Sequence, residues 1–335
     1  MSSSADPSQH SSPSISATVQ RVPEEQDVAK IAAQSCSYSL DLELMANIFL
    51  GGLGDSFPGL EDTSGLVRNL VQLAMEKRYL LHEMLALSAL QLLAGDCRRR
   101  ELKIRASYHQ AKALRLVQPH LDAVVEDHVL ALLFFSSLAA VCGIAEHSLG
   151  PDDASGEFLD PIGQTVHAFR LSRGIMTVIK PWWPYLQNTW AWSVIEKDAG
   201  AGADLSPKPG TITASYYLRS MTFGIEDRDS RAACLDAAER ILDSISLVQQ
   251  RADASMSRRL ITSWPITTHE RFNELLAQRK PVALVILAHF AVLAKLSTGL
   301  WWMKDWPKLL LEHVSVNLEE EWKEFLVWPR DIIGV

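Results

Sequence analysis

The sequence has little of what builds a metal centre or a disulfide framework. Its 335 residues contain four cysteines, Cys36, Cys97, Cys142 and Cys234, which are widely separated and form no C-x-x-C pair. A structural zinc site needs closely spaced cysteine or histidine ligands. We therefore expect no metal site, no cofactor and reduced cysteines, as in an intracellular chain.

Apolar runs long enough to cross a membrane are also lacking. Val129–Ala145 has 17 uncharged residues and Pro281–Ala294 has 14, and charged residues flank both closely. A spanning helix needs about 20 apolar residues, so we expect two buried core helices and no membrane span. The N-terminus has no signal-peptide pattern. The net charge of −8 argues against a large nucleic-acid surface.

Helical spacing of apolar residues dominates the chain after Leu40, and no stretch has the alternation of a strand. The pattern predicts an all-α fold, with a disordered Ser-rich tail at residues 1–37 and one large helical domain at residues 38–335. Helices are expected at Leu66–Arg78, Tyr79–Gly95, Cys97–Leu121 with Asp96 as its cap, Val129–Ala145, Asp160–Ile179, Arg231–Gln250 and Pro281–Met303. Ala199–Thr211 is expected to be a linker or loop, and Trp264–Pro265 a corner.

Known catalytic motifs are incomplete in this sequence. His82–Ala86 reads H-E-M-L-A and lacks the second histidine of the H-E-x-x-H zinc motif. Asp152, Asp153 and Glu157 fit the loose form of the Mg²⁺-binding motif of terpene cyclases, but they stand among turn residues and no second metal motif follows. We expect no catalytic residue and no enzyme, with a helical terpene-cyclase-like enzyme as the least favoured alternative.

Tryptophan is the abundant residue, and five of the ten tryptophans fall between Trp301 and Trp328. Trp302 and Trp306 have the i, i+4 spacing of a packed helix face, so a core is one interpretation. A pocket for a lipophilic ligand is another, with His289, Lys295 and Thr298 as its polar groups. A membrane-interface anchor is the third. For the pocket, the candidate residues are Phe134, Phe135, His289, Trp301 and Trp302.

Six blocks of sequence carry a resemblance to a known family. In order they are LDLELMANIF, LLHEMLALSALQLLAG, SYHQAKAL, DHVLALLFFSSLAAVCGIA, FRLSRGIMTVI and ALVILAHFAVLAKLSTGLWWMKDWPKLL. The chain resembles, from about Leu40 to Gly334, the regulatory domain of fungal zinc-cluster transcription factors, in particular the sterol uptake control group. The six-cysteine zinc cluster with which those factors read DNA does not occur in these residues.

The resemblance implies a nuclear effector domain of a transcriptional regulator that responds to a sterol-like or other lipophilic ligand. It implies partners in the transcription machinery or a DNA-binding partner, with no direct DNA binding by this chain and with a homodimer as a further expectation. A lipid- or sterol-binding module without a transcriptional role is the alternative from a different functional class.

Overall fold

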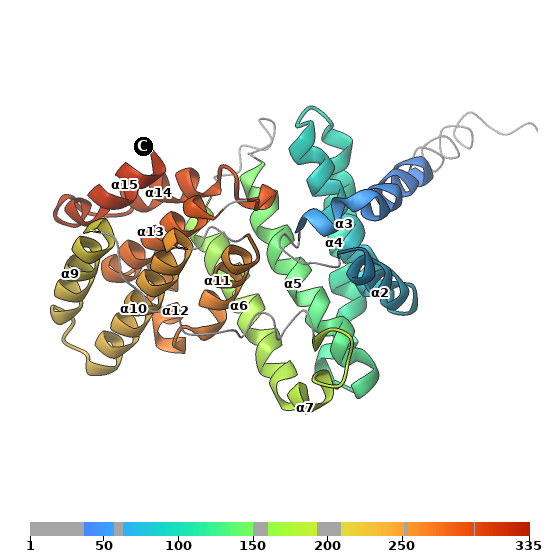
Figure 1. Ribbon diagram of the computed structural model, residues 1–335, viewed down its shortest axis with the longest axis horizontal. Coiled ribbons are helices and arrows are strands. Elements are labelled where there is room, and N and C mark those ends of the chain that lie inside the picture. The colour runs from blue at the N-terminus through green and yellow to red at the C-terminus, as the bar shows by residue number, and fades with distance from the viewer. Residues whose placement is uncertain (1–36, 57–62, 150–159, 193–208, 251–253, 298) are drawn as a thin grey trace, which may run out of the picture. The chain divides into compact units, whose positions relative to one another are not determined.

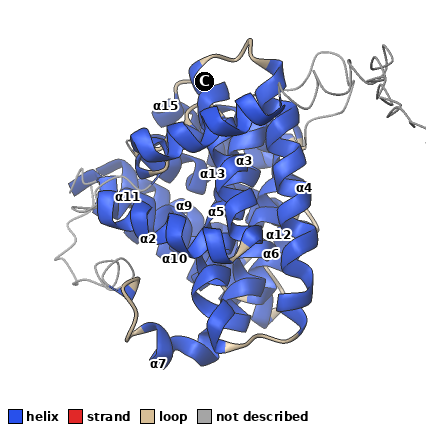
Figure 2. Ribbon diagram, turned by 90° about the vertical axis from the view of Figure 1, so that its right-hand side faces the viewer, coloured by secondary structure: helices blue, strands red, loops and turns tan. Residues whose placement is uncertain are grey.

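A computed structural model describes residues 37–56, 63–149, 160–192, 209–250, 254–297 and 299–335. Within these ranges the chain consists of helices and connecting loops and contains no strand (Figure 2). The prediction of an all-α fold is therefore confirmed. The expected tail before residue 37, Cys36, Thr298 and the acidic trio Asp152, Asp153 and Glu157 lie outside the described residues.

Contacts within the chain divide it into two units, Met1–Leu42 and Glu43–Val335. In the first unit residues 37–42 are described, and they are helical. The second unit holds all other described elements and is the subject of the sections below.

The first helices of the second unit gather around α3 (Arg78–Gly95) (Figure 1). The π-helical turn η1 (Ile48–Gly52), the 3-10 turn η2 (Gly54–Ser56), α2 (Thr63–Glu76), α4 (Arg100–Asp122) and α5 (Glu126–Ser148) follow in chain order. Helix α3 packs against α2, α4 and α5 and buries side chains on all sides, including Leu80, Met84 and Leu87. A helix that is apolar all round is stable only as a core element, which is the position that α3 occupies.

The later helices gather in the same way around α13 (Pro281–Leu296). Every residue from Val282 to Ala294 is buried, and Pro281 stands at the first turn, where its missing N–H costs no hydrogen bond. Helix α13 packs against α9 (Pro209–Phe223), α10 (Arg228–Gln250), α11 (Ala254–Thr267), α12 (Glu270–Ala277), α14 (Trp306–Val316), η5 (Glu320–Leu326) and α15 (Val327–Ile333). Helix α6 (Pro161–Ile179) packs against α5, α11, α12 and α14, and it is followed by η3 (Lys180–Trp182) and α7 (Trp183–Leu186). The turn η4 (Trp301–Met303) packs against α5, α3 and α14.

The corner between α12 and α13 depends on Arg279, whose φ of 55° lies in the left-handed region. The two helices meet there at 102°. The Arg279 guanidinium donates to Asp160 Oδ2 at 2.5 Å and to Asn317 Oδ1 at 2.8 Å. These contacts join the corner to the start of α6 and the end of α14, and they help to offset the cost of a left-handed non-glycine residue.

Four predicted boundaries were wrong. Helix α4 begins at Arg100, because the Asp96 carboxylate binds the backbone N–H and guanidinium of Arg98 and does not cap the helix. Trp264–Pro265 lies inside α11, and α9 already begins at Pro209 within the expected linker Ala199–Thr211. Pro281–Met303 is not one helix, since α13 ends at Leu296 and the tryptophans begin the separate turn η4.

One helix of the described residues is long and apolar enough to cross a membrane. It is the stretch Glu126–Glu146 of α5, and 67% of its apolar window is buried inside the protein. The bent pair of α12 and α13 passes the same test only if both are counted as one span. Core helices of globular proteins meet this criterion as well, so it is weak evidence for a membrane.

Candidate functional site

A cleft of about 780 Å³ lies among the described residues. Its walls come from η1, η2, the start of α2, the last turns of α3 and the loop leading to η4. The lining residues are Phe49, Leu50, Gly51, Gly54, Asp55, Thr63, Ser64, Val67, Arg68, Gln91, Gly299 and Trp301. Phe49 and Leu50 are 59% and 86% exposed, so apolar side chains face solvent at its rim.

A hydrogen-bond network fixes the backbone at one side of the cleft. The Asn47 amide donates to Ser88 Oγ and to Gln91 Oε1, both at 3.0 Å, and Ser88 Oγ donates to the Leu44 carbonyl at 2.9 Å. Gly52 lies against the two amides, since a Cβ there would stand 2.3 Å from Gln91 Oε1. Gly51 has a φ of 115°, which glycine adopts without strain. The glycine pair therefore allows the chain to turn closely over α3.

Trp301 forms the opposite side of the cleft. Its indole Nε1 donates to Ser56 Oγ at 3.2 Å, and the ring is only half-buried. It also lines a second cavity of about 400 Å³ formed by the end of α13, η4 and Pro307. The indole thus lies between two cavities and is positioned by one hydrogen bond to a residue 245 positions away.

Arg68 gives the cleft its positive charge. The side chain is exposed on α2, and no carboxylate pairs with it among the described residues. Asp55, the acidic lining residue, accepts a hydrogen bond from Gln91 Nε2 at 3.3 Å. An apolar rim, one indole and a small set of polar groups are the usual ingredients of a site for an amphipathic small molecule.

The five residues predicted to line a ligand pocket lie in different surroundings. Trp301 lines the cleft described above, and the other four are buried. Phe134 stacks on Trp190 at 5.2 Å between ring centroids, and Phe135 meets Tyr79 edge-on at 5.8 Å. His289 stacks on Trp328 at 5.5 Å. Trp302 is 1% exposed, and its backbone carbonyl accepts from Ser148 Oγ at 3.0 Å.

The predicted polar partners of the pocket are separated as well. His289 Nδ1 lies 2.8 Å from the Val285 carbonyl, which only accepts, so this nitrogen carries the proton. Burial lowers the pKa of His289 to about 4, and the ring is neutral at physiological pH. Lys295 is exposed and lines the smaller cavity beside Trp301.

The H-E-M-L-A stretch places two ionisable side chains on α3, the half-buried His82 and the buried Glu83. His82 Nδ1 lies 2.8 Å from His109 Nδ1 on α4, so one ring donates and the other accepts. Glu83 is fully buried on α3, and burial raises the pKa of its carboxyl to about 8. Neither carboxyl oxygen has a hydrogen-bond partner among the described residues, although the thiol of Cys142 is close enough to affect the pKa. No group of three His, Cys, Asp or Glu side chains with metal-binding geometry occurs in the described ranges.

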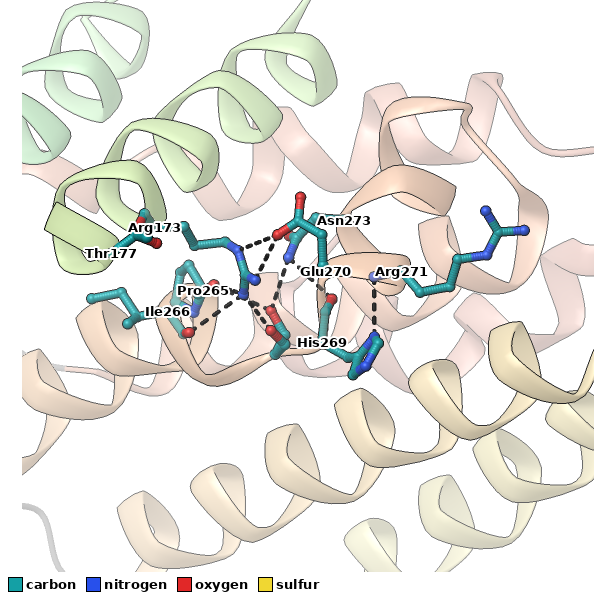
Figure 3. A network of polar contacts seen from close by, with 9 residues as sticks. Arg173, Thr177, Pro265, Ile266, His269, Glu270, Arg271 and Asn273 are labelled. Atoms are coloured by element: carbon teal, nitrogen blue, oxygen red, sulfur yellow. Dashed lines mark hydrogen bonds and ion pairs between the residues drawn. The ribbon is translucent and has the colours of Figure 1, made fainter. Parts of the chain in front are cut away.

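A network of polar contacts away from the cleft surrounds Arg173 of α6 (Figure 3). Its guanidinium donates to Glu270 Oε2 at 2.7 Å and to the carbonyls of Ile266 and Thr268 at the end of α11. Because a helix leaves its last carbonyls without partners, this arginine caps α11 and joins it to α6 and α12. A cavity of about 550 Å³ lies beside it. The guanidinium is fully engaged within the protein, so its role is structural.

Arg68, Phe49 and Leu50 were not recognised from the sequence as site residues. Phe49 and Leu50 end the apolar stretch Leu40–Leu50 directly before Gly51 and Gly52, and two large apolar residues at that place were the available signal. Arg68 gave no signal, because one arginine on an amphipathic helix is ordinary.

Comparison with known protein families shows which family the residues around the cleft resemble. Residues 53–146, from η2 through α2, α3 and α4 to the last turn of α5, match the model of the fungal specific transcription factor domain. This segment includes most of the walls of the cleft.

A particular relative matches over a longer stretch. It is a protein from Gibberella zeae named "Zn(2)-C6 fungal-type transcription factor", and it is 24% identical to this chain over 309 residues. The match covers 87% of this chain and 61% of the relative, so the chain spans about three fifths of the length of that protein.

Proposed function

We propose that this chain is the effector domain of a transcriptional regulator and acts in the nucleus without catalysing a reaction. The observation that carries the proposal is the match of residues 53–146 to the fungal specific transcription factor domain. The longer match to a Zn(2)-C6 fungal-type transcription factor supports the same role. We further propose that DNA contact is supplied by a partner or by sequence beyond these residues, because the four cysteines present here are too dispersed for a zinc cluster.

We also propose that the regulator responds to a lipophilic small molecule, sterol-like or of similar apolar character, that binds in the cleft beside Trp301. The cleft volume of about 780 Å³ is within the range of small-molecule sites, and Phe49, Leu50 and Trp301 offer apolar contact. The other four candidates, Phe134, Phe135, His289 and Trp302, then support the site from the core rather than touch the ligand.

A tethering experiment tests the transcriptional role. The chain is fused to a heterologous DNA-binding domain, and a reporter gene carrying the matching operator is measured in fungal cells. The proposal expects reporter output to differ from that of the DNA-binding domain alone, in either direction. Unchanged output, with the fusion folded and nuclear, would contradict an effector role.

A binding experiment tests the ligand response separately. Tryptophan fluorescence of the purified chain is titrated with ergosterol-like sterols and with an apolar carboxylic acid. A saturable change at micromolar ligand that is lost in Trp301→Ala and kept in Trp322→Ala is expected, since Trp322 is half-buried in η5 outside the cleft. Ligand binding together with an inactive tethered fusion would favour the alternative, a lipid-binding module without a transcriptional role.

A further inference from the structure

One face of α4 combines exposed apolar side chains with a concentration of positive charge. Ile104 is 73% exposed, Tyr108 44% and Leu114 46%. With 100° between successive residues, these three and Ala111 lie on the side opposite the buried Leu102, Ala106 and Ala113. We call this surface the α4 face and define it by Arg100, Ile104, Tyr108, Ala111, Lys112, Leu114 and Arg115.

The apolar side chains of this face are 44–73% exposed, so the described residues leave them largely uncovered. Helix α4 makes its main contacts with α3 and weaker ones with α5, and Figure 2 shows it along the right-hand edge of the helices. Exposed apolar residues scattered singly are ordinary, but a stripe at i, i+4, i+7 and i+10 on one helix is the pattern by which helices pack together. The stripe therefore offers a surface for a second helix.

The helix segment that carries the α4 face has a charge opposite to that of the whole protein. From Arg100 to Arg115 the sequence has five Lys or Arg residues and one acidic residue, Glu101, whereas the chain carries −8. Glu101 is already bound by Arg99 at 2.9 Å. Arg100, Lys112 and Arg115 have no carboxylate partner among the described residues. Lys112 lies 5.7 Å from the centre of the Tyr108 ring, so the aromatic and basic groups form one surface.

We propose that the α4 face binds an acidic amphipathic helix of a partner protein. Apolar side chains of that helix would cover Ile104, Tyr108 and Leu114, and its carboxylates would pair with Arg100, Lys112 and Arg115. A second copy of this chain does not fit, because a two-fold contact would place two basic faces together. Nucleic acid would use the basic groups and leave Ile104 and Leu114 without apolar partners. This inference extends the proposed function by naming the chemistry of a partner, but the surface itself does not depend on that function.

The experiment measures binding of a fluorescein-labelled peptide to the full chain by fluorescence anisotropy. The peptide is a designed helix with Leu and Phe at i, i+3, i+4 and i+7 and with Glu on the flanks. Three peptide controls separate the contributions: one with Gln in place of Glu, one with Ser in place of Leu and Phe, and one with Lys in place of Glu. Saturable binding of the first peptide alone, weakened by salt, is the expected result.

Variants locate the site. Ile104→Ser and the double variant Arg100→Glu with Arg115→Glu should each weaken binding about tenfold, the usual effect of removing a central contact. The controls are Tyr216→Ser, another exposed aromatic on α9, and Lys308→Glu on α14, and neither should change the affinity. All substituted residues are solvent-exposed, and circular dichroism with urea unfolding checks that each variant is folded.

Three results would overturn the inference. The first is that the peptide does not bind, and the second is that it binds the Ile104→Ser variant as tightly as the wild type. The third is that a DNA duplex or anionic vesicles displace the peptide as well as unlabelled peptide does, because binding would then depend on charge alone. The result is independent of the tethered reporter, because peptide binding by a chain that fails in the reporter would refute the effector role and leave the α4 face as a docking surface.

Discussion

Replacing Glu83 by glutamine should stabilise the protein at neutral pH and leave its stability nearly unchanged in acid. Glu83 is wholly buried, and burial raises the pKa of its carboxyl to about 8. The Cys142 thiol opposes this shift, and the negative charge of Glu146 adds to it. In the unfolded chain the same carboxyl titrates near 4.5. The native protein therefore holds a neutral carboxylic acid at a pH where the unfolded chain carries a carboxylate.

The sign and size of the effect follow from this difference. Between pH 4.5 and 8 the native state retains a proton that the unfolded state has released, so the free energy of unfolding falls as pH rises. Each pKa unit corresponds to about 1.36 kcal/mol, and roughly 2.5 units separate the unfolded pKa from pH 7. The loss at pH 7 is thus about 3 kcal/mol. Glutamine has the size of the neutral acid and cannot ionise, so Glu83→Gln should recover most of this energy.

Urea unfolding of both proteins at pH 5 and pH 7 provides the assay. The difference in unfolding free energy between Glu83→Gln and the wild type should be below about 1 kcal/mol at pH 5 and about 3 kcal/mol at pH 7. The difference is the useful quantity, because other groups such as His289 shift the wild-type curve in the opposite direction. The control Glu76→Gln changes an exposed carboxylate of α2 and should show no such divergence. A gap of equal size at both pH values would refute the assignment of a buried neutral Glu83.

Three further predictions concern the backbone and the core. Gly52→Ala should cost about 1 kcal/mol in urea unfolding, because its Cβ would displace the hydrogen-bonded side-chain amides of Asn47 and Gln91, whereas Gly143→Ala meets nothing within 4 Å and should not destabilise. Arg279→Gly should be about 1 kcal/mol more stable than Arg279→Ala, since both variants lose the same contacts and glycine adopts a φ of 55° without strain. Equal stabilities of the two variants would contradict backbone strain at this position. The pKa of His289 is about 4 in the native protein, against an ordinary value of 6.5 in the unfolded chain. Between these two pH values the unfolded chain binds a proton that the native protein does not, so lowering the pH from 6.5 to 4 should reduce the free energy of unfolding by up to about 3 kcal/mol. An NMR titration in which the His289 ring protonates above pH 6 would contradict its burial.

Continuous patterns in the sequence were enough to predict the central helices. The expected Tyr79–Gly95 agrees with α3 to one residue, because an unbroken apolar run ends at a glycine. Pro161 gave the start of α6 for a similar reason, since proline favours the first turn of a helix. In both cases the local signal and the packing agree, which is why the sequence alone was sufficient.

The errors occurred where packing overrides a local signal. The sequence predicts a corner at Trp264–Pro265, but Pro265 lies inside α11, where Trp264 is buried and donates from Nε1 to the Ala237 carbonyl at 3.3 Å. The tertiary contact compensates for the hydrogen bond that proline cannot make. At the end of α13 the sequence predicts a longer helix than the structure has. The predicted helix extends to Met303, but Ser297 leaves the helix and Gly299 has a φ of 79°, so the tryptophans belong to a new turn.

The cleft was beyond prediction because its walls meet only in the folded chain. Trp301 and Ser56 are 245 positions apart, and neither belongs to a motif that would suggest a contact. The exposure of each ring distinguishes the tryptophans in a way that composition cannot. Trp302 and Trp306 are almost completely buried and pack in the core, which favours the core interpretation for those two. Trp301 is half-exposed between two cavities, and a ring in that position can meet a ligand without any part of the core having to open.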